Sequence, residues 1–226
     1  MSPSEESQPR QSLRERQRSL TRQALLDGAR EAFAGKGYAD ITIDEIAERA
    51  GTSRGTFYLY FSKGSVLAEL IAEAFFTARG PGSQATLFGE LSDAAPYTVE
   101  SLTTWIEAYI ATWQKHATLF RAWMEGDAVD SEVRAMTDRR INRAMRAIAR
   151  ILVEVRDDAG LAYVEEDLMA RARVMDVQLQ YFCFLVVVHG IDVDLKMHAR
   201  AIAEQWYCGI FATPVTTDGR TEMRLS

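Results

Sequence analysis

The sequence is poor in the residues that build disulfide frameworks, metal sites and membrane spans. Its 226 residues include only two cysteines, Cys183 and Cys208, and three histidines, too few and too scattered for a zinc site. Both cysteines lie in apolar segments, as expected of small core residues in a reducing compartment. The longest apolar run, Tyr181–Val188, has eight residues, whereas a transmembrane helix needs about 20. The N-terminus contains no apolar signal core, so we expect a cytoplasmic protein without metal, cofactor or membrane partner.

Charge is distributed unevenly along the chain. The net charge of −6 comes from 26 basic and 32 acidic residues. Residues 1–79 hold 11 of each sign, so the whole acidic excess lies in residues 80–226. Within the first part, residues 10–22 carry five arginines against one glutamate. Such a run is typical of a segment that meets nucleic-acid phosphate and equally of a solvated arm, and composition alone leaves both interpretations open.

Apolar residues recur at helical spacing along most of the chain, which predicts an all-α fold. The segment Phe182–Val188 has strand propensity, but no second strand candidate is found to pair with it, so we expect a helix there. The expected helices cover residues 13–35, a short segment that ends at Gly51, Arg54–Phe61, 65–78, 99–115, 117–125, 131–157, 165–188 and 194–212.

Residues 42–61, TIDEIAERAGTSRGTFYLYF, have the pattern of a helix, a tight glycine-containing turn and a second short helix. Thr42 is a suitable N-cap, and Glu45 three residues later completes a capping box. Gly51 ends the first helix, and Thr52-Ser53 form the turn and cap the second helix. The pattern therefore predicts a helix-turn-helix.

The second helix of this motif has two distinct sides. Phe57 and Phe61, four residues apart, share one side and are expected in the core. The remaining positions are expected to face outward, to lie on the flanks or to begin the helix: Gly55, Thr56 and Leu59 outward, Tyr58 and Tyr60 on the flanks, and Arg54 at the N-terminal end.

These outward residues suit the major groove of DNA. Gly55 lets the helix backbone approach closely, Thr56 offers a hydroxyl and a methyl group, and Arg54 can bind guanine through two hydrogen bonds. Tyr58 and Tyr60 carry hydroxyls that reach phosphate oxygens, and the helix N-terminus attracts phosphate as well. The alternative is a plain helical hairpin whose aromatic residues are all core. The exposed geometry, the capping pattern and the basic run upstream favour DNA binding.

The segment ITIDEIAERAGTSRGTFYLYF, followed by a lysine and the apolar helix Leu67–Ala78, resembles the TetR family of bacterial transcriptional regulators. The resemblance covers about residues 19–79, and beyond them only the number and length of the helices. It implies an all-α homodimer whose N-terminal heads read a near-palindromic operator in double-stranded DNA and whose C-terminal domains bind a small effector. The family's DNA-contact positions correspond here to Thr42, Ser53, Arg54, Gly55, Thr56, Tyr58 and Tyr60.

The sequence departs from the family pattern just after Phe61. The family usually has a lysine three residues after that phenylalanine, at the start of the fourth helix. Here that position is Gly64, and Lys63 lies one residue earlier. Lys63 has a long flexible stem, so it is kept among the expected phosphate contacts.

The chain thus divides into five expected parts. They are a disordered tail (1–12), a three-helix helix-turn-helix DNA-binding domain (13–79), a Gly/Pro/Ser-rich linker (80–98), a larger helical effector-binding and dimerisation domain (99–213) and a loose tail (214–226).

Large apolar side chains gather in the second half of the chain. Core packing is the favoured explanation for any one of them, while the resemblance implies a pocket for an apolar or aromatic effector. The candidate pocket residues are Trp105, Tyr109, Trp113, Phe120, Trp123, Met145, Gln178 and Phe182. On the helix 131–157, a row of arginines suggests either an anion site or, as the favoured interpretation, a solvated face paired with nearby acids: Arg139, Arg143, Arg146 and Arg150.

The last two helices contain more apolar surface than one buried face needs, which favours a four-helix interface between two copies. Specific DNA binding also asks for a dimer, because one helix-turn-helix makes few contacts. The sequence therefore predicts a ligand-responsive repressor, with an activator left open. A carrier of apolar molecules without DNA binding is the other alternative. An enzyme is not expected, because neither a Ser-His-Asp or Cys-His pattern nor a Gly-rich phosphate loop can be recognised.

Overall fold

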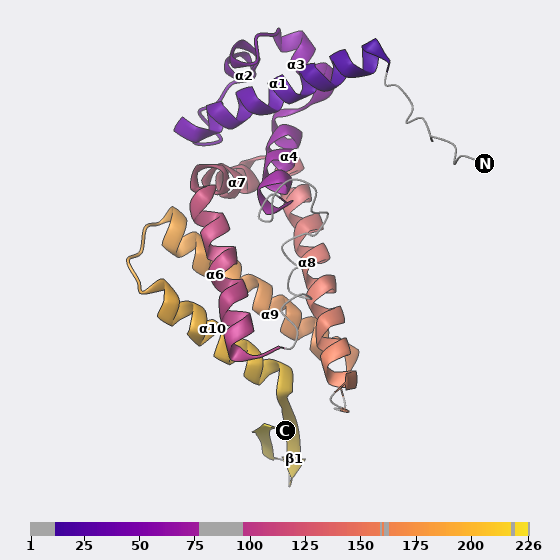
Figure 1. Ribbon diagram of the computed structural model, residues 1–226, viewed down its shortest axis with the longest axis vertical. Coiled ribbons are helices and arrows are strands. Elements are labelled where there is room, and N and C mark those ends of the chain that lie inside the picture. The colour runs from indigo at the N-terminus through magenta and orange to yellow at the C-terminus, as the bar shows by residue number, and fades with distance from the viewer. Residues whose placement is uncertain (1–11, 77–96, 159, 161–162, 218–219, 226) are drawn as a thin grey trace, which may run out of the picture.

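The computed structural model describes residues 12–76, 97–158, 160, 163–217 and 220–225. An N-terminal head of four helices sits on a larger C-terminal bundle (Figure 1). The head contains α1 (Leu13–Gly35), α2 (Ile43–Arg49), α3 (Arg54–Tyr60) and α4 (Lys63–Phe76). The bundle contains α6 (Val99–Lys115), α7 (Ala117–Val129), α8 (Ser131–Asp158), α9 (Glu165–Cys183), the π-helical segment η2 (Phe184–Val188) and α10 (Leu195–Phe211), followed by β1 (Ala212–Thr217) and β2 (Arg220–Leu225).

The expected all-α fold and the sequence of helices are confirmed. Side-chain caps fix the N-terminal ends of most of the described helices. At the start of α1, the Ser12 hydroxyl accepts the Glu15 backbone N–H at 3.2 Å, and the Glu15 carboxylate accepts that of Ser12 at 2.8 Å. At the start of α2, the Thr42 hydroxyl accepts the Glu45 N–H at 3.2 Å. The capping box expected there is only half formed, because the Glu45 carboxylate pairs with Lys36 and Arg49 instead.

The start of α4 and the end of α7 differ from the expectation by two and four residues. α4 begins at Lys63 rather than at residue 65, because Ser62 and Ser65 cap one another: the Ser62 N–H donates to Ser65 Oγ at 2.8 Å, and the Ser65 N–H to Ser62 Oγ at 3.0 Å. α7 continues to Val129, four residues beyond the predicted end. The expected tail 1–12 and linker 80–98 lie almost wholly outside the described residues, apart from Ser12, Tyr97 and Thr98.

The C-terminal segments show one confirmed and one wrong prediction. Residues 182–188 are helical as expected, and η2 has the wider π spacing, with the His189 N–H bonded to the Phe184 carbonyl at 3.1 Å. The expected loose tail after residue 213 is wrong, because β1 and β2 pair antiparallel with Thr217 opposite Arg220. The sequence signal for this hairpin is Asp218-Gly219 between two segments that favour strands.

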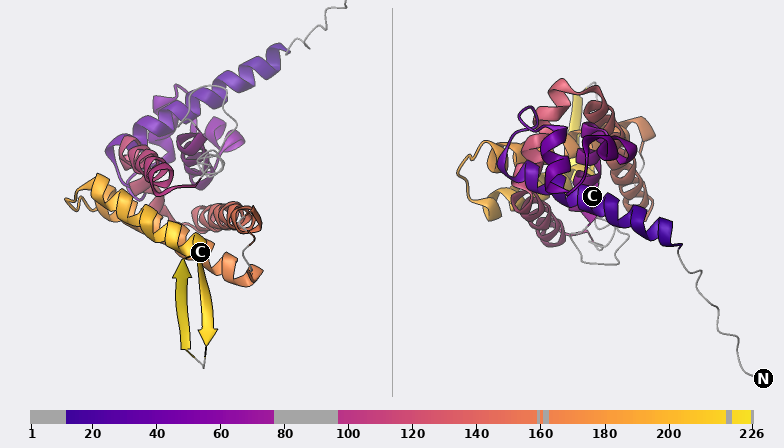
Figure 2. Two further views of the ribbon diagram at one scale, coloured as in Figure 1. Left: turned by 60° about the horizontal axis from the view of Figure 1, so that its bottom comes forward. Right: turned by 90° about the horizontal axis from the view of Figure 1, so that it is seen from above.

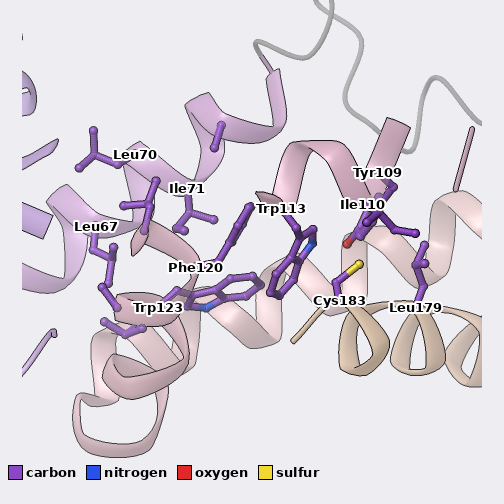
Figure 3. Packing of buried hydrophobic residues seen from close by; sticks show 14 of the residues in the cluster. Leu67, Leu70, Ile71, Tyr109, Ile110, Trp113, Phe120, Trp123, Leu179 and Cys183 are labelled. Atoms are coloured by element: carbon purple, nitrogen blue, oxygen red, sulfur yellow. The ribbon is translucent and has the colours of Figure 1, made fainter. Parts of the chain in front are cut away.

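One hydrophobic core runs through the head and the bundle. In Figure 3 it passes from Leu67 and Ile71 of α4, through the α7 rings, to Trp113 of α6. Trp113 stacks on Phe120 with ring centroids 4.3 Å apart, and Trp123 lies beside both. Because α4 packs on α7 and α8, the head is joined to the bundle through buried apolar contacts.

The molecule is elongated, with free extensions at both ends. The N-terminal turns of α1 project beyond the head, and the β1–β2 hairpin points away from the far end of the bundle (Figures 1 and 2). Within the bundle, α6 packs against α10 and α8 against α9. Among the helices of the described ranges, none has the length and apolar character required to cross a membrane.

Candidate nucleic-acid interface

The turn between α2 and α3 depends on two glycines. Gly51 has a φ of +63°, and it ends α2 in a Schellman motif: the Thr52 N–H bonds to the Ala47 carbonyl at 2.9 Å and the Gly51 N–H to the Glu48 carbonyl at 3.0 Å. Gly28 of α1 faces the end of α2, where an added Cβ would lie 2.9 Å from Ile46 O. Gly28 was not predicted from the sequence. Because it has no side chain, α1 can pack closely against the C-terminal end of α2.

α3 is anchored on one side and open on the other. The Ser53 hydroxyl caps its N-terminus by accepting the Thr56 N–H at 3.1 Å. Phe57 is fully buried and Phe61 nearly so, as expected from their spacing. On the opposite side Tyr58 and Leu59 are 55% and 78% exposed. A short helix therefore presents large side chains to solvent while two phenylalanines hold it in place.

The predicted contact residues of α3 are not equally available. At Gly55 an added Cβ would meet only Ser53 Oγ, at 3.7 Å, so the surface there is open. Thr56 is half-buried, and its hydroxyl lies 3.0 Å from Ser53 Oγ, within the cap. Tyr60 is half-buried and packs against the core. Of the predicted set on this helix, Gly55 and Tyr58 are thus exposed, as is Arg54.

Arg54 is held by protein groups in the free structure. Its guanidinium pairs with Asp44 of α2 at 2.8 Å, contacts the Tyr58 hydroxyl at 3.4 Å and lies 5.6 Å from the Tyr58 ring centroid. The hydrogen bond to Asp44 is the main cause that raises the pKa of Arg54. Thr42 is exposed beside this pair, at the N-terminus of α2. A guanine or phosphate contact by Arg54 would therefore replace an exposed ion pair, which contributes little.

Lys63 lies at the boundary between head and bundle. Its ammonium nitrogen is 4.4 Å from the centroid of the Tyr38 ring. Burial lowers the pKa of Lys63, although Asp130 and Asp40 act in the opposite direction. The neighbouring Gly64 faces Glu132 of α8, whose Oε2 would lie 3.0 Å from an added Cβ. A lysine at position 64, as in the family pattern, would therefore lie beside the Glu132 carboxylate. A phosphate contact by Lys63 stays a prediction.

A second attachment of the head, which we call the Tyr38 junction, joins the α1–α2 loop to α7 and the α7–α8 turn. The Tyr38 N–H donates to Glu125 Oε2 at 2.7 Å, and its hydroxyl donates to Asp130 Oδ2 at 2.6 Å. Its ring packs on Gly126, where an added Cβ would lie 3.2 Å from it. Nearby, the Ser62 hydroxyl donates to Glu132. Burial, and then the bond to Asp130, raise the pKa of Tyr38.

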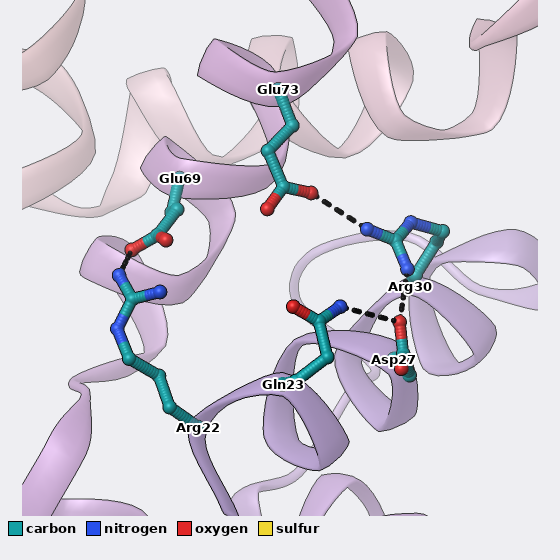
Figure 4. Close-up of polar contacts among 6 residues, drawn as sticks. All are labelled: Arg22, Gln23, Asp27, Arg30, Glu69 and Glu73. Carbon is teal, nitrogen blue, oxygen red and sulfur yellow. Dashed lines mark hydrogen bonds and ion pairs between the residues drawn. The ribbon is translucent and has the colours of Figure 1, made fainter. Parts of the chain in front are cut away.

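The basic run of α1 has two parts. Arg22 pairs with Glu69 of α4 and lies over the Phe61 ring, 5.2 Å from its centroid, while Arg30 further along pairs with Glu73 at 2.7 Å (Figure 4). These pairs fasten α1 to α4. Three arginines in the projecting turns are exposed, and so remain available for phosphate: Arg14, Arg16 and Arg18.

The candidate pocket residues of the bundle fall into two groups. Gln178 accepts a hydrogen bond from Trp206 Nε1 at 3.1 Å, and Phe182 stacks on His198, so both belong to the contact between α9 and α10. The other six are buried in the bundle: Trp105, Tyr109, Trp113, Phe120, Trp123 and Met145.

Three of the predicted arginines line an open groove between α8 and α9. The groove has a volume of about 570 Å³. Across the described ranges, Arg143, Arg146 and Arg150 have no carboxylate within ion-pair distance, so the expected pairing with nearby acids is not found there. The lining residues are Arg143, Arg146, Ala149, Arg150, Val153, Glu154, Glu165, Leu168 and Met169.

Arg140, on the same helix, was not recognised from the sequence. Its guanidinium nitrogens are buried in the bundle, 3.6 Å from Asp176 of α9 at the shortest ion-pair distance. A helical pattern assigns arginines to the polar face, so it gives no signal for one that turns inward.

Comparison with known proteins places the head in a family. The family model for bacterial regulatory proteins of the tetR family matches residues 25–70. The HTH-type transcriptional repressor Rv1474c of Mycobacterium tuberculosis is 31% identical over 157 residues, which cover 66% of this chain and 81% of that protein. The uncharacterized HTH-type regulator YvdT of Bacillus subtilis is 43% identical over 53 residues, 24% of this chain. YvdT and two other curated relatives are matched over only 25% to 40% of their own length.

The fold extends the similarity to the bundle. The transcriptional regulator FadR from Bacillus subtilis, solved in complex with stearoyl-CoA, superposes with a TM-score of 0.62 at 19% identity, covering 80% of this chain and 95% of that one. The helix-turn-helix, the family match and the long alignment with Rv1474c agree with one another. The chain belongs to the TetR family of bacterial transcriptional regulators.

Proposed function

We propose that the protein is a ligand-responsive repressor that binds a near-palindromic operator as a homodimer. The observation that carries the proposal is the exposed face of α3, where Gly55, Tyr58 and Leu59 face solvent while Phe57 anchors the helix. Two such helices, one from each protomer, enter successive major grooves about 34 Å apart. The repressor name of the M. tuberculosis relative supports repression over activation.

Each predicted contact has a role in this complex. Gly55 and Tyr58 meet the groove, and Arg54 exchanges Asp44 for a base edge or a phosphate. The remaining contacts hold the sugar-phosphate backbone around the recognition helix: Thr42, Ser53, Thr56, Tyr60 and Lys63. The exposed arginines at the start of α1 add positive charge beside the duplex.

The proposed dimer uses the outer surface of α9 and α10. Val174, Val177 and Tyr181 follow one another at steps of three and four on α9, and each is more than half exposed. Met197 of α10 is also exposed. Apolar side chains gathered on one helix face favour burial against a second copy.

The proposed effector binds among the aromatic residues of the bundle and favours a protomer arrangement that no longer fits the operator. The coupling is reciprocal, so operator DNA weakens effector binding by the same factor, typically about 5–150-fold. The stearoyl-CoA bound by the B. subtilis neighbour has a long apolar acyl chain, which supports an effector with an apolar part.

Fluorescence anisotropy with a labelled duplex from the region upstream of the protein's own gene tests the proposal. We expect tight binding to this duplex and weak binding to a scrambled duplex of equal length. Affinity should fall linearly with salt on logarithmic axes between about 50 and 200 mM. Equal affinity for both duplexes, or none for either at low salt, would contradict the proposal and favour a carrier without DNA binding.

A further inference from the structure

Arg140 of α8 carries a positive charge into the interior of the C-terminal bundle. Its Nε, Nη1 and Nη2 atoms are buried, and none of them makes a hydrogen bond. The ion pair from Nη2 to Asp176 Oδ2 is 3.6 Å long, whereas a charge-assisted hydrogen bond is about 2.7–2.9 Å. A guanidinium offers five N–H donors, and buried polar groups are almost always satisfied. The donors of Arg140 are therefore available to an acceptor that enters the bundle.

Asp176 does not satisfy this arginine as a close partner would. Its Oδ2 already accepts a hydrogen bond from Gln180 Nε2 at 2.6 Å, and its Oδ1 is buried without a hydrogen bond. Burial raises the pKa of Asp176, although Arg140 and Gln180 act in the opposite direction. Tyr109 of α6, whose hydroxyl is buried as well, also interacts with this carboxylate.

Aromatic residues lie close to the charged pair. The guanidinium lies over the Trp123 ring of α7, 5.1 Å from its centroid. Tyr109 of α6 interacts with Arg140, Asp176 and Cys183, and Figure 3 shows Trp113 and Cys183 beside Tyr109. A buried cation whose donors make no hydrogen bond, beside aromatic side chains of α6 and α7, suits an organic anion with an apolar body.

We propose that Arg140 binds the carboxylate of an apolar carboxylic acid inside the bundle, with the apolar part of the acid against Trp123 and its neighbours. The inference rests on the proposed effector function and adds the charged group of the ligand. A carboxylate matches the planar fork of the guanidinium with two parallel hydrogen bonds. It carries one negative charge, whereas a phosphate dianion would bring a second charge close to Asp176.

The groove of Arg143, Arg146 and Arg150 provides the matched comparison. These arginines lie on the same helix but are exposed, so water satisfies their donors. A carboxylate preference that depends on Arg140 and not on Arg146 locates the site in the interior.

Isothermal titration calorimetry of the full chain without DNA tests the proposal. The probes are dodecanoate and 2-naphthoate, each compared with its neutral alcohol, dodecan-1-ol and 2-naphthalenemethanol. In the wild-type protein we expect at least one acid to bind 10-fold or more tightly than its alcohol. Arg140→Gln should abolish this preference, and Arg146→Gln should keep it. No preference in the wild type, or a preference that survives Arg140→Gln, overturns the proposal.

Asp176→Asn keeps the test independent of whether Arg140→Gln folds. The amide removes the negative charge beside the guanidinium while keeping the shape of the side chain, so the acid should bind at least as tightly as in the wild type. A 10-fold weaker acid in Asp176→Asn, with a melting temperature no lower than that of the wild type, overturns the proposal. Operator affinity is measured separately. Specific DNA binding without any carboxylate preference would sink this inference alone, and the reverse result would sink the repressor proposal alone.

Discussion

At Gly55 of α3, helix stability and close approach to a bound duplex favour different side chains. Within the protein an added Cβ meets only Ser53 Oγ, at 3.7 Å, and alanine favours a helix over glycine by about 0.5–1 kcal/mol. We therefore expect Gly55→Ala to keep or raise the melting temperature and to weaken operator binding about 10-fold, because the methyl group would stand between the helix and the groove (about 1.4 kcal/mol). Thermal unfolding and fluorescence anisotropy measure the two effects.

Gly35→Ala serves as its control. Gly35 is also helical, and an added Cβ there meets no atom within 4 Å. It lies at the far end of α1 from the projecting arm, so operator affinity should not change. Equal operator affinities for Gly55→Ala and wild type would show that α3 does not approach DNA through this residue.

Tyr58 offers the cleanest test of a single hydroxyl. The side chain is more than half exposed, and its hydroxyl has only the long 3.4 Å contact with Arg54 in the described structure. Tyr58→Phe should therefore leave stability unchanged and weaken operator binding by about 1–3 kcal/mol. Thr56→Ala should weaken binding over the same range, but its hydroxyl also belongs to the α3 cap. Unchanged affinity in both variants would refute the assigned reading face.

Asp130 and Asp176 should give opposite pH profiles. For Asp130, burial raises the pKa, but the hydrogen bonds from Tyr38 and two backbone N–H groups outweigh it, and the pKa is lowered. Its contribution to stability is present above pH ~4 and is lost as the pH falls through the lowered value. For Asp176, burial prevails and the pKa is raised. Its contribution therefore falls as the pH rises from ~4 through the raised value.

Melting temperatures of two variants between pH 3 and 7 check these signs. Relative to wild type, Asp176→Asn should become progressively more stable as the pH rises above about 4. Asp130→Asn should be least stable near neutrality and should approach the wild type below about pH 4. Parallel profiles for the two variants would contradict the assigned shifts.

At the scale of helices, the predicted boundaries were accurate where a capping residue stood next to a periodic apolar segment. α1 and α6 begin and end where the pattern placed them, and Asp194 caps α10 by accepting the Met197 N–H at 3.0 Å. α4 begins two residues earlier than predicted because Ser62 and Ser65 cap one another. The spacing of apolar residues gives no sign of such a pair of caps. The β1–β2 hairpin was missed although Asp218-Gly219 is a turn signal, because the segments on either side lack a clear alternation of apolar and polar residues.

Tertiary contacts account for what the sequence did not reveal at the candidate sites. A helical period separates the apolar from the polar side of α8, but it does not say that Arg140 turns inward while Arg143 and Arg146 face solvent. That outcome depends on where α9 covers α8. The role of Gly28 likewise depends on how closely α2 crosses α1, which no local pattern reports.

The exposed face of α9 can be tested by introducing a charge there. Val177→Glu should place a charge in the middle of the proposed four-helix interface, produce monomers and weaken operator binding by at least 10-fold, because two heads no longer bind as one unit. Val164→Glu, another exposed valine just before α9, should leave the dimer intact. Sedimentation equilibrium measures the mass of both. A Val177→Glu protein that stays dimeric would move the interface elsewhere.

At the scale of the whole molecule, the Tyr38 junction adds a second connection between head and bundle beside α4. The bond from the Tyr38 hydroxyl to Asp130 joins a buried donor to a carboxylate, a class worth about 1.5–3 kcal/mol. We expect Tyr38→Phe to lower the free energy of unfolding by that amount in urea titrations. A double-mutant cycle with Asp130→Asn should give a coupling energy above about 0.5 kcal/mol. Additive effects would show that the two groups do not stabilise one another.

These two connections limit how the head can respond to a ligand. A head joined to the bundle at one point could rotate independently of it. A head joined at both α4 and the Tyr38 junction moves together with its bundle. In the proposed dimer, the distance between the two recognition helices then depends on the angle at which the protomers cross. Because the molecule is long, a small rotation of the bundle produces a large displacement of the recognition helix at the duplex.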